Sequence, residues 1–425
     1  MPGRAYRRKG LPHHGYHRYD RDVNETCDVL IIGGGLVGAS LAIALDGAGL
    51  HVALAEAAPP RVDLQPSYDE RNLALARVSV NALEALGVLD ATTPTTPISR
   101  IHVSRRGDFG AVRMDAAELG LPAFGAVLAA RELGNALLRR LDRCAGLVRI
   151  APAQAVAIEA GGDAVEVTLR SGETTRDVRT RLLVGADGTA SFVRHASGID
   201  AVRHDYAQSA FVTTLTVDKP LGGVAFERFT DSGPVALLPL GERRAGVVLT
   251  VPTVDAERVA ALDDSAFIAL VHERFGWRAG RFSRPGQRKP YPLARLLAAR
   301  TSAPRTVLVG NAAQTVHPIG AQGFNLGLRD ALTLAELLRE AAIANADPGA
   351  ETLLAQHVEL RAPDRVATTS FSDDLVRLMG NDFLPLRLAR SLGFHALDRI
   401  APLKRRFALR GMGLRGNVPG LGLLR

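Results

Sequence analysis

The feature that most constrains this fold is a short unit near the start of the sequence. An apolar run at residues 27–32 predicts a buried strand, a helix is expected at 39–45, and a second strand is expected at 51–55. Three glycines with the spacing G-x-G-x-x-G separate the first strand from the helix, and these are Gly33, Gly35 and Gly38. A strand, a helix and a second strand in this order form a βαβ unit, so the sequence predicts an α/β fold.

The same unit is what a dinucleotide-binding site requires. Gly33 allows the tight turn, Gly35 lets a pyrophosphate approach the backbone, and Gly38 lets the helix pack closely on the strand. The second strand ends at Glu56, whose carboxylate can accept hydrogen bonds from ribose hydroxyls and disfavours a 2′-phosphate. We therefore expect the bound nucleotide to be FAD or NAD.

A second glycine-rich crossing lies far along the chain. The apolar residues 307–309 predict a buried strand, which breaks at Gly310 and Asn311, and a helical pattern resumes at 326–340. Such a crossing brings the backbone and the positive end of a helix close to a planar or phosphorylated ligand. Taken alone, it could equally be an ordinary tight connection between a strand and a helix.

Three further positions carry candidate ligand-binding groups. Asp187 and Gly188 follow the strand that ends an alternating segment at 147–185, and the carboxylate there can accept hydrogen bonds from sugar hydroxyls. Standing alone, an Asp-Gly turn is usually structural. Arg71 opens a stretch rich in alanine and leucine, where it either reaches over a cofactor or lies on a surface loop, and Arg131 begins a helix expected at 132–141.

The middle of the chain predicts a second sheet, and the last third predicts helices. Turn signals separate four expected strands, which are 211–217, 224–229, 235–240 and 245–251. We interpret them as an antiparallel sheet that holds a substrate. Helices are expected at about 264–275 and 351–378, and residues 383–425 are basic with apolar spacing.

Charge and composition exclude several classes of protein. The net charge is +8, but residues 1–22 carry +4 and residues 398–425 carry +6, which leaves about −2 for the body. This distribution argues against a nucleic-acid enzyme with a basic groove. Two cysteines, Cys27 and Cys144, provide no disulfide framework and no metal site, so a cytoplasmic protein is expected. No apolar run is long enough to span a bilayer, and residues 1–26 do not form a secretory signal.

Three turns taken together resemble one family. Gly33–Gly38, Asp187-Gly188 and Gly310-Asn311, in this order, resemble the signature of the group A flavoprotein monooxygenases. Residues 225–240 and 317–330 are similar to the ubiquinone-biosynthesis hydroxylases within that group. At the last turn the family usually has Gly-Asp-Ala-Ala-His, whereas this sequence has Gly-Asn-Ala-Ala-Gln at 310–314. That departure looks like the branch that hydroxylates 2-polyprenyl-6-methoxyphenol.

The resemblance implies an architecture of the p-hydroxybenzoate hydroxylase type, in which a Rossmann-like FAD-binding domain carries an inserted antiparallel-sheet substrate domain and a helical C-terminal region. The expected FAD-binding segments are 27–97, 126–200 and 300–345, and the expected substrate segments are 98–125 and 201–299. Residues 346–425 would form the helical region with a basic tail. Residues 1–26 are expected to be a disordered basic extension.

The resemblance also implies a role for each site residue. Arg71 and Arg131 would contact FAD, and Asp187 and Asn311 would bracket its ribityl chain and pyrophosphate. Asparagine keeps an oxygen acceptor but lacks the charge of aspartate, so its hydrogen bond should be weaker. Residues 318–325 would line the isoalloxazine, with Phe324 and Asn325 among the FAD-binding residues. The residues assigned to catalysis in this loop are Pro318, Gln322 and Gly323.

The reaction implied is hydroxylation of a polyprenylated phenol. NAD(P)H would reduce the flavin, O2 would form a C4a-hydroperoxide, and the electron-rich ring would take up a hydroxyl group. No second GxGxxG for nicotinamide is present, in keeping with transient NAD(P)H binding in this family. No residue can be named as the base that ionises the phenol, and His317 is either structural or a proton carrier.

The lipid-soluble substrate implies contact with a membrane or a lipid-binding protein, for which the basic and apolar residues 403–424 are the candidate. The alternatives are hydroxylation of another ring position or another aromatic substrate, a polyprenyl reductase, or a flavin-binding scaffold in a biosynthetic assembly. A halogenase would need a Trp-x-Trp motif, and the only tryptophan is Trp277.

Overall fold

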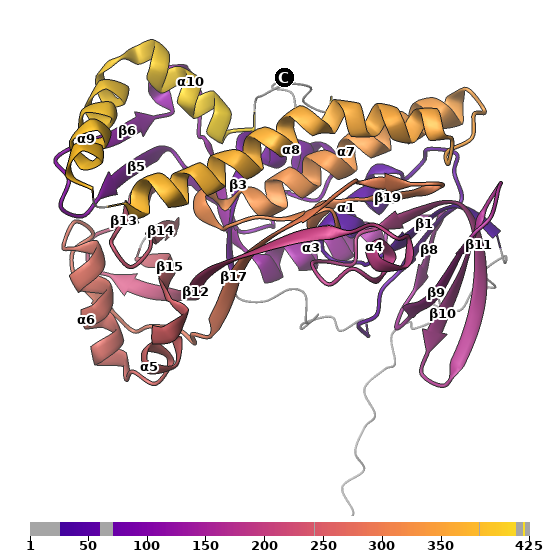
Figure 1. Ribbon diagram of the computed structural model, residues 1–425, viewed down its shortest axis with the longest axis horizontal. Coiled ribbons are helices and arrows are strands. Elements are labelled where there is room, and N and C mark those ends of the chain that lie inside the picture. Colours follow the sequence, from indigo (N-terminus) through magenta and orange to yellow (C-terminus); the bar gives the residue numbers. More distant parts are fainter. Residues whose placement is uncertain (1–25, 60–70, 242, 382, 414–419, 421–425) are drawn as a thin grey trace, which may run out of the picture.

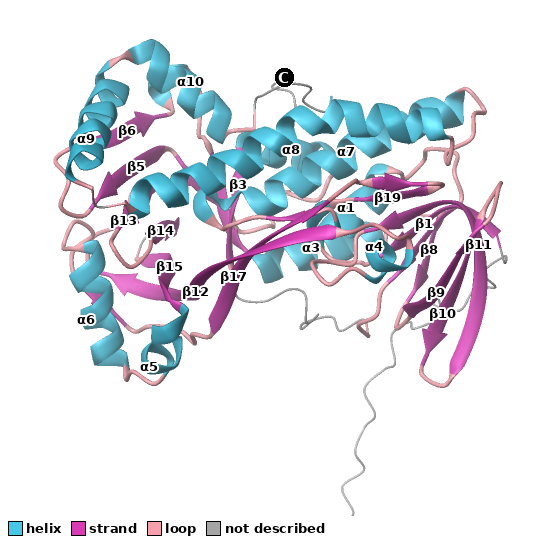
Figure 2. Ribbon diagram, viewed as in Figure 1, coloured by secondary structure: helices cyan, strands magenta, loops and turns pink. Residues whose placement is uncertain are grey.

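The computed structural model describes residues 26–59, 71–241, 243–381, 383–413 and 420. Two large sheets lie toward opposite ends of an elongated molecule, and the long strands β12 and β17 run between them (Figure 1). The long helices α7 and α8 lie side by side along one side of this arrangement (Figure 2). The expected disordered extension at 1–26 lies outside the described residues except for Thr26, which begins the first strand.

The first sheet contains the predicted βαβ unit. Its strands, in spatial order, are β18 (Ser302–Ala303), β19 (Thr306–Leu308), β11 (Thr174–Gly185), β1 (Thr26–Ile32), β2 (Val52–Ala55) and β8 (Leu147–Ile150). The four strands from β19 to β2 are parallel to one another, and β8 is parallel to β2. The hairpin β9 (Gln154–Ala160) and β10 (Val165–Ser171) extends β11 in the antiparallel direction.

The first sheet is buried on both faces because the side chains of β1 alternate between two cores. Val29 and Ile31 pack on one side against the helices, while Leu30 and Ile32 pack on the other side. The helices of the first side are α1 (Leu36–Ala44), α2 (Arg77–Ala85), α3 (Ala130–Leu141) and α7 (Gln322–Ile343). The short helix α4 (Phe192–Ala196) lies on the second side. An apolar run with no polar alternation is typical of such a doubly covered strand.

The second sheet is larger and almost entirely antiparallel. Its strands, in spatial order, are β20 (Gln314–Thr315), β17 (Pro290–Ala298), β12 (Ala201–Val217), β15 (Arg244–Pro252), β14 (Val235–Leu240), β13 (Val224–Phe229), β5 (Arg100–Arg105) and β6 (Ala111–Asp115). The four strands expected at 211–251 pair antiparallel, and the added pair formed by β13 and β5 is parallel. The short strand β16 (Phe282–Ser283) pairs with β12. Helices α5 (Ala256–Ala260) and α6 (Asp264–Phe275) cover one face of this sheet.

A small third sheet and the C-terminal helices complete the fold. The small sheet contains β3 (Asn72–Ala76), β7 (Gly125–Ala129) and β4 (Thr96–Ile98). The C-terminal helices are α8 (Glu351–Gly380), α9 (Leu384–Arg399) and α10 (Ala401–Gly411), and the last two pack beside β5 and β6 (Figure 1). Single-turn 3-10 helices occur at Ala117–Leu119, Thr253–Asp255, Gly310–Ala312 and Ile319–Ala321. Within the described ranges, no helix combines the length and apolar character needed to cross a bilayer.

Candidate active site

The first glycine turn is in contact with the Asp187–Gly188 turn. Gly33 has φ +105°, and a Cβ at this position would lie 2.5 Å from the carbonyl oxygen of Ala186. A Cβ at Gly38 would lie 1.9 Å from the carbonyl oxygen of Gly33. Both positions therefore require glycine, because a side chain would collide with backbone atoms. The structure thus places two turns that are about 150 residues apart in sequence directly against each other.

Gly35 faces open space instead. Among the described residues, no atom outside its chain neighbours lies within 4 Å of a Cβ built at Gly35, and no side chain caps helix α1 at this residue. Gly188 is open in the same sense, and both glycines line one large cavity. The free N–H groups in the first turn of α1 therefore have room for an anionic group, as a pyrophosphate requires.

Two acidic residues of the predicted site are held by the backbone around them. Glu56, at the end of β2, accepts hydrogen bonds from the amide nitrogens of Gly34 at 2.6 Å and Ala58 at 2.8 Å. Asp187 accepts a hydrogen bond from the Ser191 hydroxyl at 2.5 Å and another from the Val193 amide at 3.0 Å, which fixes the start of α4. The residues on either side of Asp187 line the cavity, whereas Asp187 and Glu56 are not among its lining residues.

The two predicted arginines lie at neighbouring strand ends. The Ala130 amide donates a hydrogen bond to the carbonyl oxygen of Arg71 at 2.7 Å, where β3 and β7 pair. The Arg71 guanidinium lies 5.5 Å from the ring centroid of Tyr291, and both residues line the cavity. Arg131 lies in the first turn of α3, 3.5 Å from the Glu132 carboxylate, and does not line the cavity.

The contacts of the third turn show what Asn311 and Gln314 do in the sequence Gly-Asn-Ala-Ala-Gln at 310–314. Asn311 is exposed and lines the cavity. Gln314 is buried and donates a hydrogen bond of 2.6 Å to the carboxylate of Asp330 on α7. Gly310 has φ +60°, and its Cα would lie 2.8 Å from a Cβ at Gly327, so this turn packs tightly on α7. Gln314 therefore serves to anchor the turn, while Asn311 is left facing the cavity.

The loop before α7 carries the residues assigned to catalysis. Pro318, Gln322, Gly323 and Phe324 line the cavity, and the Gln322 side chain donates a hydrogen bond to the Gly320 carbonyl at 3.0 Å. The residue before the helix, Ala321, has φ +53°, which is a strained conformation for a residue with a side chain. Helix α7 begins at 322, four residues earlier than expected, so Gln322 to Asn325 form its first turn.

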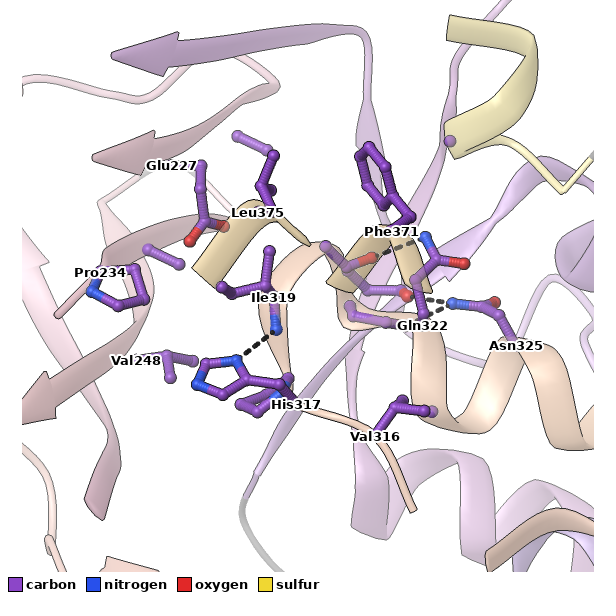
Figure 3. Close-up of a pocket in the computed structure, with 18 of the residues that line it drawn as sticks. Glu227, Pro234, Val248, Val316, His317, Ile319, Gln322, Asn325, Phe371 and Leu375 are labelled. Carbon is purple, nitrogen blue, oxygen red and sulfur yellow. Dashed lines mark hydrogen bonds between the residues drawn. The ribbon is translucent and has the colours of Figure 1, made fainter. Parts of the chain in front are cut away.

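Asn325 clamps this loop to the small sheet. Its side-chain oxygen accepts a hydrogen bond of 2.8 Å from the Ala76 amide, and its side-chain nitrogen donates to the carbonyl oxygens of Ala74 at 3.0 Å and Ala321 at 2.7 Å. Asn325 is almost fully buried, although it borders the cavity (Figure 3). Its amide therefore positions the loop that faces the cavity, a role the sequence had not indicated.

The cavity that these turns share has a volume of about 1390 Å³. One end is formed by the glycine turns, and the other lies between the second sheet and helices α8, α9 and α10. The walls are mostly apolar. The charged or titratable side chains among the described residues that line the cavity are Arg71, Glu227, Tyr291, His317, Asp374 and Arg390.

His317 is held as a neutral ring. Its Nδ1 accepts a hydrogen bond from the Ile319 amide at 3.3 Å (Figure 3), and its Nε2 lies 3.2 Å from the side-chain oxygen of Gln208. These partners require the proton to be on Nε2. Burial lowers the pKa of His317 to about 4, against the opposing charge of Asp373. Both nitrogens are thus engaged, which favours the structural role of His317 over proton transfer.

Glu227, on β13, is a site residue that the sequence reasoning missed. Burial raises the pKa of its carboxyl group to about 7. Among the described residues it has no hydrogen-bond or ion-pair partner. Strand alternation could have identified this residue, because Glu227 lies on the same face of β13 as the apolar residues Ala225 and Phe229.

These features fit a bound FAD. The open glycine cradle at the start of α1 suits a pyrophosphate, and the carboxylate of Glu56 lies where the adenosine ribose of a dinucleotide fold is held. The apolar cavity beyond the third turn can accept a planar ring system. Both cysteines are free, and no cluster of possible metal ligands occurs in the part of the chain that the structure describes.

Comparisons with known proteins agree with this assignment. The family model described as "FAD binding domain" matches residues 26–371. The chain is 38% identical over 391 residues to the ubiquinone hydroxylase UbiL of Rhodospirillum rubrum, covering 92% of this chain and 90% of the relative. It is 32% identical over 399 residues to the 3-demethoxyubiquinol 3-hydroxylase of Escherichia coli, covering 92% of this chain and 100% of the relative.

The fold also matches solved structures. The p-nitrophenol 4-monooxygenase of Pseudomonas putida superposes with a TM-score of 0.76 at 20% identity, covering 92% of this chain and 99% of that chain. This likeness concerns the architecture, with an FAD-binding sheet, a second sheet and C-terminal helices arranged as expected.

Proposed function

Because the chain belongs to the FAD-binding-domain family of FAD-dependent aromatic monooxygenases, we propose that it hydroxylates the ring of a polyprenylated phenol in ubiquinone biosynthesis, with NAD(P)H and O2 as co-substrates. The observation that carries this proposal is the single cavity that joins the three glycine turns to a long apolar chamber. A ring at the flavin end and a prenyl tail along the apolar end would both be accommodated. The names of two relatives, a ubiquinone hydroxylase and a 3-demethoxyubiquinol 3-hydroxylase, support the substrate class.

The residues of this chain would position the cofactor and exclude water. The first turn and the start of α1 would hold the pyrophosphate, and Asn311 would offer an uncharged oxygen to the ribityl chain. The amides at the start of α7, after Ala321, would stabilise negative charge on the isoalloxazine. Bound FAD would supply the oxygen-transfer chemistry, while the apolar walls of the chamber keep water from the reacting ring.

The ring position follows only from the branch resemblance at residues 310–314, which favours 2-polyprenyl-6-methoxyphenol as the substrate. The test is mass spectrometry of quinone intermediates in cells that lack this protein. Accumulation of 2-polyprenyl-6-methoxyphenol is the expected result, and accumulation of a different precursor would assign another ring position. Purified protein should be yellow and should oxidise NAD(P)H faster when a methoxyphenol is added. Yellow protein that ignores every phenol would instead indicate a flavin-binding scaffold.

The exposed side of α9 supports peripheral contact with an anionic membrane. Leu384, Leu388 and Leu392 are spaced by four residues, so they form one stripe, and each is more than half exposed at 63%, 51% and 61%. Basic side chains follow this stripe at the C-terminal end of α9 and on α10, and the exposed ones are Arg399, Arg405 and Arg406. Phe394 and Leu397 on the opposite side of the same helix line the cavity. A prenyl tail could therefore pass from the lipid into the chamber beside this helix.

Co-sedimentation with vesicles that contain anionic lipid tests this contact. We expect the full chain to bind, and both removal of residues 400–425 and replacement of the three leucines of the stripe by serine to reduce binding. Val254→Ser is the matched control, because Val254 is an exposed apolar residue (92%) on the far side of the second sheet. Equal binding by all four proteins would contradict the proposal, and a requirement for a second protein would point to a lipid-binding partner instead.

A further inference from the structure

Glu227 is a carboxylate in a wall of apolar side chains. It lies on β13 between Ala225 and Phe229, and all three line the cavity. Figure 3 shows its carboxylate directed into the cavity, with Ile319 and Leu375 among the labelled residues around it. Because Ile319 belongs to the loop that precedes α7, Glu227 faces the same space as the residues assigned to the flavin ring.

The charged groups of the cavity do not neutralise Glu227. Arg390 forms an ion pair with Asp108 at 2.7 Å, and Arg71 lies over the ring of Tyr291. Asp374 is an exposed residue on α8 and has the same charge as Glu227. No described cation shifts the pKa of Glu227, and burial alone raises it to about 7. An unpaired carboxylate in an apolar wall disfavours folding, so a ligand that donates a hydrogen bond would complete this site.

We propose that Glu227 is a catalytic residue that binds the hydroxyl group of the phenol substrate and accepts its proton during ring hydroxylation. The inference rests on the proposed function. A phenol donates one hydrogen bond, which a carboxylate accepts, and the rest of the ring and its tail would contact the apolar walls around Glu227. His317, a titratable residue of this loop, already has both nitrogens engaged with protein partners.

The proton transfer assists oxygen insertion because a phenolate ring carbon is a stronger nucleophile than a phenol ring carbon. As the ring carbon takes up one oxygen atom of O2, the proton moves from the hydroxyl oxygen to Glu227. When the ring regains aromaticity, its C–H proton is released to the leaving oxygen and Glu227 returns its proton to the ring oxygen. NAD(P)H supplies a hydride, which carries the two electrons, and solvent supplies one proton, so the second oxygen atom leaves as water. The carboxylate therefore ends the cycle as it began. A base whose pKa is near the working pH is best suited to such a transfer.

The test compares the wild type with Glu227→Gln, with 2-geranyl-6-methoxyphenol as the probe. Glutamine keeps the shape and can bind the hydroxyl, but it cannot take the proton. We expect hydroxylated product to form about 100-fold more slowly, with a small change in KM. NAD(P)H oxidation should continue and release hydrogen peroxide. The wild-type kcat/KM should rise with pH through about 7, because the base must be ionised, and this rise should be absent from the variant.

A second measurement distinguishes proton transfer from a merely structural role. The deficit of Glu227→Gln should shrink when a ring-fluorinated probe with a more acidic hydroxyl is used, because that substrate needs less help to ionise. Glu227→Asp keeps the carboxylate and should recover the pH dependence. If Glu227→Gln loses its flavin, the comparison of Glu227→Asp with the wild type provides the test. Glu159→Gln is the control, since Glu159 is exposed on β9 of the other sheet and lines no part of the cavity.

The outcomes separate the two proposals. If Glu227→Gln hydroxylates the probe with wild-type coupling and the wild-type pH profile, the role of Glu227 is wrong while the proposed function stands. If the flavin-loaded wild type hydroxylates no phenol, the proposed function itself fails. A deficit of the same size for fluorinated and unfluorinated probes would reject proton transfer and leave Glu227 without a catalytic role.

Discussion

Two regions of this molecule hold carboxylates away from bulk solvent in opposite ways, one in a fully buried set of ion pairs and the other in the half-buried Glu227 of the cavity wall. Between α7 and α8, Arg329 donates to Asp364 at 2.7 Å, and Arg361 donates to Asp330 at 2.7 Å and to Asp364 at 2.5 Å. All four side chains are less than a tenth exposed, and their charges balance. In the cavity, Glu227 has an apolar environment and no described partner.

The difference shows which buried charges hold the fold and which are available for chemistry. Burial raises the pKa of Asp364, but the charges and hydrogen bonds of Arg329 and Arg361 outweigh this effect and bring the pKa to about 2. The paired carboxylate therefore stays ionised, and through Gln314 the network also fixes the turn that carries Asn311. A carboxylate without such partners keeps a pKa near neutrality, where it can exchange a proton.

The largest expected effect comes from breaking the paired set. Asp364→Asn leaves two buried guanidinium groups with one carboxylate, so we expect a loss of about 3–5 kcal/mol in the free energy of unfolding. Chemical denaturation at pH 7 measures this loss. In the wild type, the stabilisation from the low pKa of Asp364 should be complete above pH 4 and should disappear as the pH falls toward 2.

The control for this variant is the double replacement Arg329→Met with Asp364→Leu. It removes one positive and one negative charge together, so it should cost less than Asp364→Asn alone. A double variant as unstable as the single one would mean that the packing of these side chains, and not their charge balance, holds α7 against α8.

The next largest loss of stability is expected from Asn325, an uncharged side chain whose oxygen and nitrogen both form hydrogen bonds. Asn325→Ala would leave the Ala76 amide and two carbonyl oxygens without partners, so we expect a loss of about 2–3 kcal/mol. The loop before α7 should also loosen, so the purified variant should retain less flavin, measured from its absorbance after gel filtration. Asn381→Ala is the matched control, because Asn381 is exposed and its side chain accepts a local hydrogen bond from the Phe383 amide. Equal stability of the two variants would show that the clamp is dispensable.

Asn325 also shows where sequence reasoning stops. The resemblance places Asn325 in the loop that would line the flavin ring, and in the structure Asn325 borders the large cavity. Its hydrogen bonds, however, reach β3 about 250 residues earlier, and no local pattern indicates such a pairing. By contrast, the βαβ unit and the three glycine turns were predictable, because glycine spacing and apolar runs reflect purely local geometry.

The strands of the second sheet also divide into those that local sequence patterns predict and those that they do not. Of the four strands expected between 211 and 251, three match their actual bounds within one residue and the fourth matches the second part of β12, since alternation and turn residues mark them clearly. The first half of β12 and all of β17 were missed. Residues 201–208 are mostly exposed because they cross between the two sheets, so they lack an apolar face. β17 contains Pro290 and Pro292, which normally argue against a strand.

Glu227 itself should show its unpaired state in the pH dependence of stability. Its raised pKa means that the folded protein holds a proton that the unfolded chain releases between pH 4.5 and about 7. Stability should therefore fall as pH rises through this window. Glu227→Gln removes this penalty, so without phenol it should be more stable than the wild type by about 1–2 kcal/mol at pH 8 and equal to it at pH 4. Thermal unfolding at both pH values provides the measurement, and a variant that is less stable at pH 8 would mean that Glu227 has a cationic partner after all.

The smallest effect should come from an ion pair that is as short as the buried ones but exposed. Arg179 and Asp163 approach to 2.7 Å, the same distance as Arg329 and Asp364, yet their side chains are 46% and 82% exposed. Water and salt screen such a pair, so Asp163→Asn should change the free energy of unfolding by less than about 0.5 kcal/mol. Denaturation at low and high salt should show that even this difference vanishes at high salt. If Asp163→Asn cost as much as Asp364→Asn, the distance between the charged atoms, and not their burial, would set the strength of these ion pairs.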